Sequence, residues 1–136
     1  NATGRVQRKV LSRERQEFPR LDERLTGKPY RYAYTVGIDI DRPTPNALLR
    51  HDLHTGETVR HAYGPHHISG EVVFVPAHAD AAENEGWLLS YVHDINGGNS
   101  QVVILNAQDI EGAPQAVIDL PVRVPLGFHG NWIAAT

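Results

Sequence analysis

Residues 87–105 read WLLSYVHDINGGNSQVVIL, two strand-like runs joined by the polar turn Asn96-Gly97-Gly98-Asn99. Asn-Gly and Gly-Gly pairs tolerate positive φ and are strong signals for a tight connection between antiparallel strands. Residues 87–95 and 101–105 are therefore predicted to form a β-hairpin. The compact apolar run at residues 72–75, which precedes this hairpin, predicts a buried strand.

The same alternation of strand-forming residues and turn signals continues over most of the chain. A second hairpin is predicted around the turn His54-Thr55-Gly56. Residues 77–86 are predicted to form a loop and residues 109–112 one short helical turn, and no long helix is predicted. The predicted strands cover residues 5–11, 30–36, 48–53, 57–63, 72–75, 87–95, 101–105 and 115–120.

These strands predict an all-β fold built from small antiparallel sheets. Units of about 40–50 residues, each an up-and-down sheet, are typical of propeller blades. We predict approximate blade units over residues 5–63 and 71–120, followed by a closing segment over residues 121–136. A β-sandwich of about seven or eight strands is the alternative that chain length favours.

The composition excludes several classes of protein. The 136 residues are 40% hydrophobic and 21% charged, with a net charge of −3 and no dense basic run. This composition excludes a disordered tail and provides no electrostatic footprint for nucleic acid. Cysteine is absent, which excludes disulfide scaffolds, zinc–thiolate sites and cysteine nucleophiles. Methionine is also absent and the chain begins at Asn1, so we expect it to be part of a longer protein.

Three ionisable residues lie among apolar residues, glycine or proline, where an unpaired charge is costly. Glu17, Glu71 and His129 are separated by 54 and 58 residues, about one blade length. Equivalent positions on the inner strands of successive blades converge on the propeller axis, so the spacing predicts that these side chains meet there. A metal centre whose histidine is supported by a carboxylate has this composition. Taken singly, each residue has a plainer interpretation: Glu17 as a solvated loop residue, Glu71 as an edge charge at a strand start and His129 as a structural hydrogen-bonding group.

No other pattern predicts catalysis. The sequence has no glycine-rich phosphate loop, no Gly-x-Ser-x-Gly elbow and no HExxH zinc helix. The other seven of the eight histidines lie on predicted outer strands or in loops, and we assign none of them to a metal site.

Several short motifs, in order along nearly the whole chain, resemble the C-terminal part of the carotenoid cleavage oxygenases, a family that includes lignostilbene dioxygenases and retinoid isomerases. Each motif is weak alone, but the ordered set is specific. The motifs are EFPRLDERLTG at 17–27, Arg31-Tyr32, His51-Asp52-Leu53 with Thr55-Gly56, GEVVFVP at 70–76, EGWLL at 85–89 and Phe128-His129-Gly130.

This resemblance implies a seven-bladed β-propeller that holds non-haem Fe(II) on its axis through four histidines. His129 matches the last of these ligands. Glu17 and Glu71 match two of the three glutamates that hydrogen-bond to the ligand imidazoles. The remaining ligands and the third glutamate would belong to blades outside this chain.

The implied function is the C-terminal part of a dioxygenase that uses O₂ to cleave a conjugated C=C bond of a carotenoid, apocarotenoid or stilbene, giving carbonyl products. We expect the 136-residue chain by itself to be inactive, with one ligand of four. One alternative is a non-catalytic truncated β-domain that acts as an interaction or assembly module. Another is a calcium-dependent lactonase propeller, which would need carboxylate and carbonyl ligands.

The same resemblance sets expectations for partners. They are an apolar conjugated small molecule and O₂, with no nucleic acid. A fragment of about two blades exposes apolar faces and strand edges, so we expect association with the missing blades or self-association. We expect a cytoplasmic location, with peripheral membrane contact as an option for an enzyme of apolar polyenes.

Overall fold

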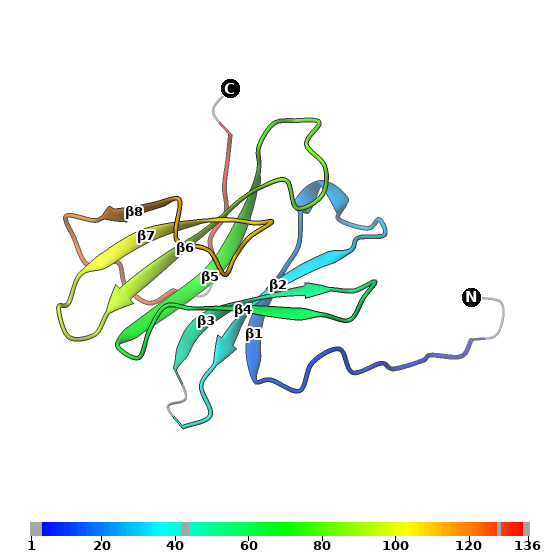
Figure 1. Ribbon diagram of the computed structural model, residues 1–136, viewed down its shortest axis with the longest axis horizontal. Helices are drawn as coiled ribbons and strands as arrows, with labels where there is room; N and C mark the ends of the chain where they lie inside the picture. Colours follow the sequence, from blue (N-terminus) through cyan, green and yellow to red (C-terminus); the bar gives the residue numbers. More distant parts are fainter. Residues whose placement is uncertain (1–3, 42–43, 128, 135–136) are drawn as a thin grey trace.

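The computed structural model describes residues 4–41, 44–127 and 129–134, and these form two four-stranded antiparallel sheets (Figure 1). The first sheet has the order β1-β2-β3-β4 and the second the order β5-β6-β7-β8. The elements are β1 Gln16–Arg20, the 3₁₀ turn η1 Glu23–Leu25, β2 Tyr32–Ile38, β3 Pro45–Asp52, β4 Thr58–Ala62, β5 His67–Pro76, β6 Gly86–Asp94, β7 Ser100–Asn106 and β8 Ala116–Asp119.

Each sheet uses four consecutive strands, so neighbours along the chain are also neighbours in the sheet. This is the up-and-down order of propeller blades, whereas immunoglobulin-type sandwiches distribute their strands between sheets through Greek-key connections. The sandwich alternative is therefore wrong, and the prediction of an all-β fold with about two blades is confirmed. No helix within the described residues has the length and apolar character that crossing a membrane requires.

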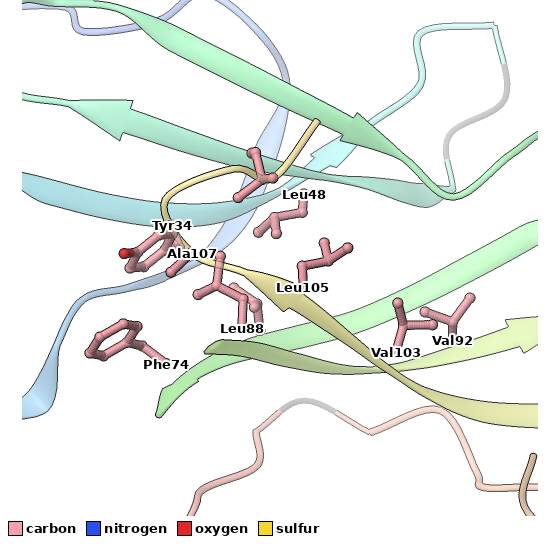
Figure 2. Close-up of a cluster of buried hydrophobic side chains, with 10 residues drawn as sticks. Tyr34, Leu48, Phe74, Leu88, Val92, Val103, Leu105 and Ala107 are labelled. Carbon is pink, nitrogen blue, oxygen red and sulfur yellow. The ribbon is translucent and has the colours of Figure 1, made fainter. Parts of the chain in front are cut away.

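The hydrophobic core lies between the two blades and draws on both. Tyr34 and Leu48 come from the first sheet, and Phe74, Leu88 and Leu105 come from the second (Figure 2). The rings of Tyr34 and Phe74 are stacked with their centroids 6.0 Å apart. Burial of these side chains against one another couples the two sheets, since each large apolar side chain contributes about 1.5–3 kcal/mol when fully buried.

The predicted strand at residues 5–11 is wrong, because the described part of this segment has no regular structure. Its apolar residues have no buried face to pack against, and Val6 is 95% exposed. The first sheet begins instead at β1, which the sequence analysis missed. A proline and an interrupted pairing with β2 obscure the period-2 pattern of this short strand.

Both β1 and β5 contain a bulge. Between Glu17 and Arg20 two residues of β1 lie opposite one residue of β2, and Phe18 has a φ of 54°. In β5 the register shifts between Ser69 and Val72, so the segment that includes Glu71 is displaced from regular pairing with β6. Bulges redirect side chains, and they are frequent next to functional sites.

The connections are mostly as predicted. Residues 77–85 form an irregular loop between β5 and β6. Residues 109–112 form turns rather than the expected helical turn, with a single bridge between Asn106 and Asp109. Gly86, the first residue of β6, is required by close packing, since a Cβ there would lie 2.1 Å from the carbonyl oxygen of Val75.

Candidate functional site

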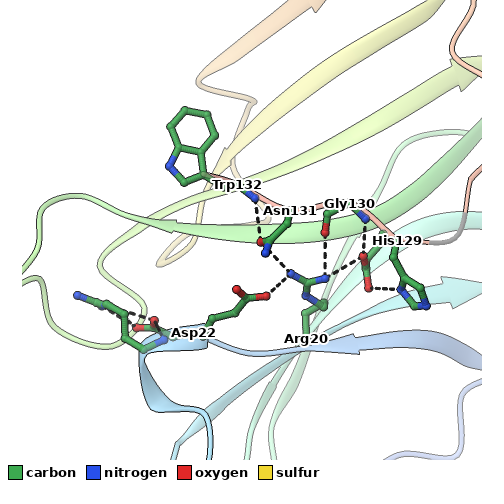
Figure 3. Close-up of polar contacts among 9 residues, drawn as sticks. Arg20, Asp22, His129, Gly130, Asn131 and Trp132 are labelled. Atoms are coloured by element: carbon green, nitrogen blue, oxygen red, sulfur yellow. Dashed lines mark hydrogen bonds and ion pairs between the residues drawn. The ribbon is translucent and has the colours of Figure 1, made fainter. Parts of the chain in front are cut away.

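The structure brings together two of the three predicted site residues. Nδ1 of His129 lies 3.1 Å from Oε1 of Glu71, although the two residues are 58 positions apart in the chain. Glu71 comes from the bulge of β5. His129 comes from the segment that follows β8 (Figure 3). A second bond joins the same segments, since the backbone N–H of Gly130 donates to Oε2 of Glu71 at 3.0 Å.

The hydrogen bond between Glu71 and His129 fixes which ring nitrogen of the imidazole carries the proton. An ionised carboxylate only accepts hydrogen bonds, so Nδ1 of His129 carries the proton that Glu71 accepts. In the neutral ring this places a lone pair on Nε2, the arrangement in which a carboxylate-supported histidine binds a metal ion. The side chain of Glu71 is 5% exposed and that of His129 is 75% exposed. The carboxylate is therefore a fixed, buried support, and the imidazole faces outward from this part of the protein.

Arg20 completes the polar cluster, and sequence reasoning did not select it. Its Nη1 donates to Oε2 of Glu71 at 2.9 Å and to the carbonyl oxygen of Gly130 at 3.1 Å. Its Nη2 donates to Glu23 and to Oδ1 of Asn131 (Figure 3). The sequence offers one indirect signal, since Arg20 lies three residues after Glu17, at the other end of the bulge in β1.

Glu17 lies close to this cluster in the chain but does not join it. Among residues 4–41, 44–127 and 129–134, none forms a hydrogen bond or ion pair with its exposed carboxylate. The next residue, Phe18, contacts His129 instead: the two rings form a T-shaped pair with their centroids 5.9 Å apart. The left-handed φ of Phe18 costs a non-glycine residue on the order of 1–3 kcal/mol, and it occurs where the aromatic ring meets the imidazole.

The described residues contain no cluster of three or more histidine, cysteine, aspartate or glutamate side chains that could hold a metal ion. His129 nevertheless fits an iron site as one ligand among several, because its supported imidazole leaves Nε2 available. The matching motif Phe128-His129-Gly130 is described only in part, since Phe128 lies outside the described residues, as do parts of the predicted closing segment 121–136.

Two histidines of the first sheet, the buried His51 and the half-buried His61, have structural roles. His51 has both ring nitrogens engaged, Nδ1 with the hydroxyl of Thr58 at 2.9 Å and Nε2 with Oε1 of Gln16 at 2.8 Å. Burial lowers the pKa of His51 and keeps it neutral. His61 likewise uses Nδ1 to contact the carbonyl oxygen of Ile110 at 2.7 Å.

Known proteins match nearly the whole length of this chain. The family model described as retinal pigment epithelial membrane protein matches residues 1–134. A carotenoid cleavage oxygenase of Mycobacterium tuberculosis is 38% identical over 141 aligned residues, covering 99% of this chain and 28% of the relative. An apocarotenoid-15,15'-oxygenase of Synechocystis is 32% identical and is matched over 96% of this chain and 27% of its own length.

The fold is also that of solved relatives. The crystal structure of cobalt-substituted Synechocystis apocarotenoid oxygenase superposes with a TM-score of 0.91 and 32% identity, covering 98% of this chain and 28% of that chain. The chain thus spans little more than a quarter of the length of these relatives. The family match over residues 1–134 shows that this chain belongs to the retinal pigment epithelial membrane protein family, that of the carotenoid cleavage oxygenases.

Proposed function

We propose that this chain is the C-terminal part of a non-haem Fe(II) dioxygenase that cleaves a conjugated C=C bond of a carotenoid, apocarotenoid or stilbene with O₂ to give carbonyl products. The observation that carries the proposal is the contact between Glu71 and His129, which holds an imidazole with Nε2 available to a metal. The names of the relatives supply the substrate class, since they include a carotenoid cleavage oxygenase and a lignostilbene-alpha,beta-dioxygenase of Sphingomonas paucimobilis.

In this proposal His129 is one of the iron ligands, and the iron supplies the capacity to bind and activate O₂ beside an apolar alkene. Glu71 holds the proton on Nδ1 and fixes the orientation of the ring. The Phe18 ring packs against the imidazole in a T-shaped arrangement and limits its rotation. The remaining ligands are supplied by histidines outside this chain.

Glu17 has a separate role in the proposal. It precedes the strained Phe18, and its carboxylate is exposed and free of hydrogen bonds within the described part of the chain. We assign it to support a second ligand imidazole that comes from a neighbouring blade. Glu17 directly precedes Phe18 in the sequence, and the Phe18 ring contacts His129.

The test uses the full-length protein that contains this sequence, purified without oxygen. His129→Ala should remove most of the bound iron and abolish cleavage of carotenoid and stilbene substrates to aldehydes. Glu71→Gln should weaken iron binding by about 10–100-fold, since an amide has only one acceptor oxygen. If that oxygen accepts from Arg20 and Gly130, the amide nitrogen faces Nδ1 of His129 and cannot accept its proton. His78→Ala, on the exposed loop before β6, is the matched control and should retain iron and activity.

The outcomes separate the alternatives. Full iron content and turnover in His129→Ala would contradict the ligand assignment. A full-length protein that never binds iron would favour the non-catalytic interaction or assembly module. A calcium requirement that is indifferent to His129 would favour a lactonase-type propeller.

A further inference from the structure

We propose that Arg20 is a positioning residue for the metal centre, acting through Glu71 and through the backbone of the segment that carries His129. This inference rests on the proposed function. Within the described residues, no hydrogen bond joins Arg20 to the imidazole of His129. Its contacts join three segments that are remote in sequence, namely β1, the bulge of β5 and residues 130–131.

The first contribution of Arg20 is to Glu71. A carboxylate that is 5% exposed is costly unless its charge is compensated, and the Arg20 guanidinium at 2.9 Å is the cationic partner that the structure provides. This bond occupies Oε2 and leaves Oε1 directed at Nδ1 of His129. Without the guanidinium, the carboxylate would lose the contact that fixes its rotation, and the imidazole would lose its orientation in turn.

The second contribution is to the backbone on either side of Gly130. Arg20 donates to the Gly130 carbonyl oxygen at 3.1 Å and to Oδ1 of Asn131 at 3.4 Å. The N–H of Gly130 is held at the same time by Glu71. Gly130, the residue directly after His129, is therefore held at both its N–H and its C=O, and Arg20 takes part in both contacts, directly or through Glu71.

The geometry requires an arginine. One nitrogen, Nη1, is shared by Glu71 and Gly130, while Nη2 reaches Glu23 and Asn131. A planar guanidinium presents these donors in a rigid fork, whereas a lysine offers a single ammonium that would satisfy only part of the set. At 16% exposure the Arg20 side chain is also shielded from solvent that could replace it.

Arg24 provides a matched control. It lies four residues further along the chain and pairs with the buried Asp22, and it donates to the carbonyl oxygen of Ala79 at 2.8 Å. Within the described residues it forms no hydrogen bond or ion pair with Glu71 or with the segment after His129, so its loss tests for a general effect of removing a paired arginine.

The experiment measures the affinity of the metal-free full-length protein for Co(II) alone, from the visible absorption of the bound ion, together with the Tm. We expect Arg20→Gln to bind Co(II) about 10–100-fold more weakly than the wild type, as for loss of other groups that orient ligands. Arg20→Lys should lie between the two. Arg24→Gln should lower the Tm while its Co(II) affinity stays within about twofold of the wild type.

Three results would overturn the inference. Co(II) affinity of Arg20→Gln within about twofold of the wild type would show that Arg20 is not needed for metal binding. An equal loss of affinity in Arg24→Gln would show a general effect of destabilisation. In both cases the proposed function stands if His129→Ala still abolishes binding. If the wild-type protein does not bind Co(II), or if His129→Ala binds it as tightly as the wild type, both the role of Arg20 and the proposed function would be overturned.

Discussion

The phenol hydroxyl of Tyr34 in β2 donates a buried hydrogen bond of 2.6 Å to Oδ1 of Asn84, in the loop between β5 and β6. This bond crosses from one blade to the other. The adjacent Glu83 accepts the backbone N–H groups of Arg31 and Tyr32, both at 2.7 Å, so the loop caps the entry to β2 as well. Burial raises the pKa of Tyr34, which keeps its hydroxyl protonated as the donor. The loop therefore fastens the second blade to the first.

Tyr34→Phe should destabilise the protein by about 1–3 kcal/mol. The substitution keeps the ring stacked on Phe74 but leaves the buried Oδ1 of Asn84 without its donor. Urea denaturation of the full-length protein measures the loss. Tyr91→Phe, on a residue that is 53% exposed, should change stability by less than about 0.5 kcal/mol. Equal effects of the two substitutions would contradict the assigned role of this bond.

Asn84→Ala should cost more than Asn84→Gly, by about 1 kcal/mol. Both substitutions remove the acceptor of the Tyr34 hydroxyl, but Asn84 has a φ of 69°, which glycine adopts freely and alanine does not. Denaturation midpoints of the two variants isolate the backbone contribution, because the lost hydrogen bond is common to both. The reverse order of stability would show that the loop relaxes out of this conformation.

Gly86→Ala should be severely destabilising, by about 3 kcal/mol or more, or should prevent folding. The added Cβ would lie 2.1 Å from the carbonyl oxygen of Val75 and 2.9 Å from Cα of Pro76, and these are backbone atoms of the paired strand that cannot move aside alone. Gly127→Ala is the control, since a Cβ there meets nothing within 4 Å. Soluble yield and Tm report the difference, and a tolerated Gly86→Ala would refute the close approach of β5 and β6.

Stability should fall as the pH drops below about 4. The Arg31 guanidinium, followed by the backbone N–H groups of Thr55 and His54, holds the pKa of Asp52 well below its usual value of about 3.9. A carboxyl whose pKa is lower in the folded state contributes its full stabilisation above the unfolded pKa. It loses this contribution as the pH falls through the folded pKa.

Asp52→Asn should therefore lower stability at neutral pH and flatten the acid limb of the pH profile, as measured by urea denaturation between about pH 2 and pH 7. Asp41→Asn, at an exposed loop position, is the charge-matched control and should retain the wild-type profile. An acid limb that is unchanged in Asp52→Asn would show that other carboxyls dominate it, with Asp94 the first to test because two backbone N–H groups lower its pKa.

The turn between β3 and β4 and the turn between β6 and β7 have the same pattern of residues, which is visible in the sequence. His51-Asp52 and His93-Asp94 recur 42 residues apart, and each pair is followed by a glycine of positive φ, Gly56 and Gly98. In both turns the histidine contacts a hydroxyl seven residues later, through His51 to Thr58 at 2.9 Å and through His93 to Ser100 at 3.4 Å. The glycines alone were enough to predict both turns, and the repeated His-Asp pair is a second signal for them.

Strands with tight turns were predicted well, whereas β1 was not. The segments from β2 to β8 are bounded by Gly, Asn and Pro and contain alternating or continuous apolar runs, so short-range patterns suffice to locate them. The strand β1 pairs with β2 across a bulge at Phe18 and Pro19, which removes the period that such reasoning needs. The charged segment before it was predicted as a strand although it has no neighbour to pair with.

By itself, the amino-acid sequence determined the all-β class, the organisation into two sheets and the choice of Glu71 and His129 as candidate site residues. These could be predicted because hairpins and ionisable residues within apolar segments are local features of the chain. Only the tertiary structure decided which groups meet: it placed His129 against Glu71, put Phe18 rather than Glu17 beside the imidazole, and inserted Arg20 between β5 and the last segment. The physical reason is that side-chain direction at a bulge and the return path of a long connection depend on packing between distant segments, which no local pattern encodes.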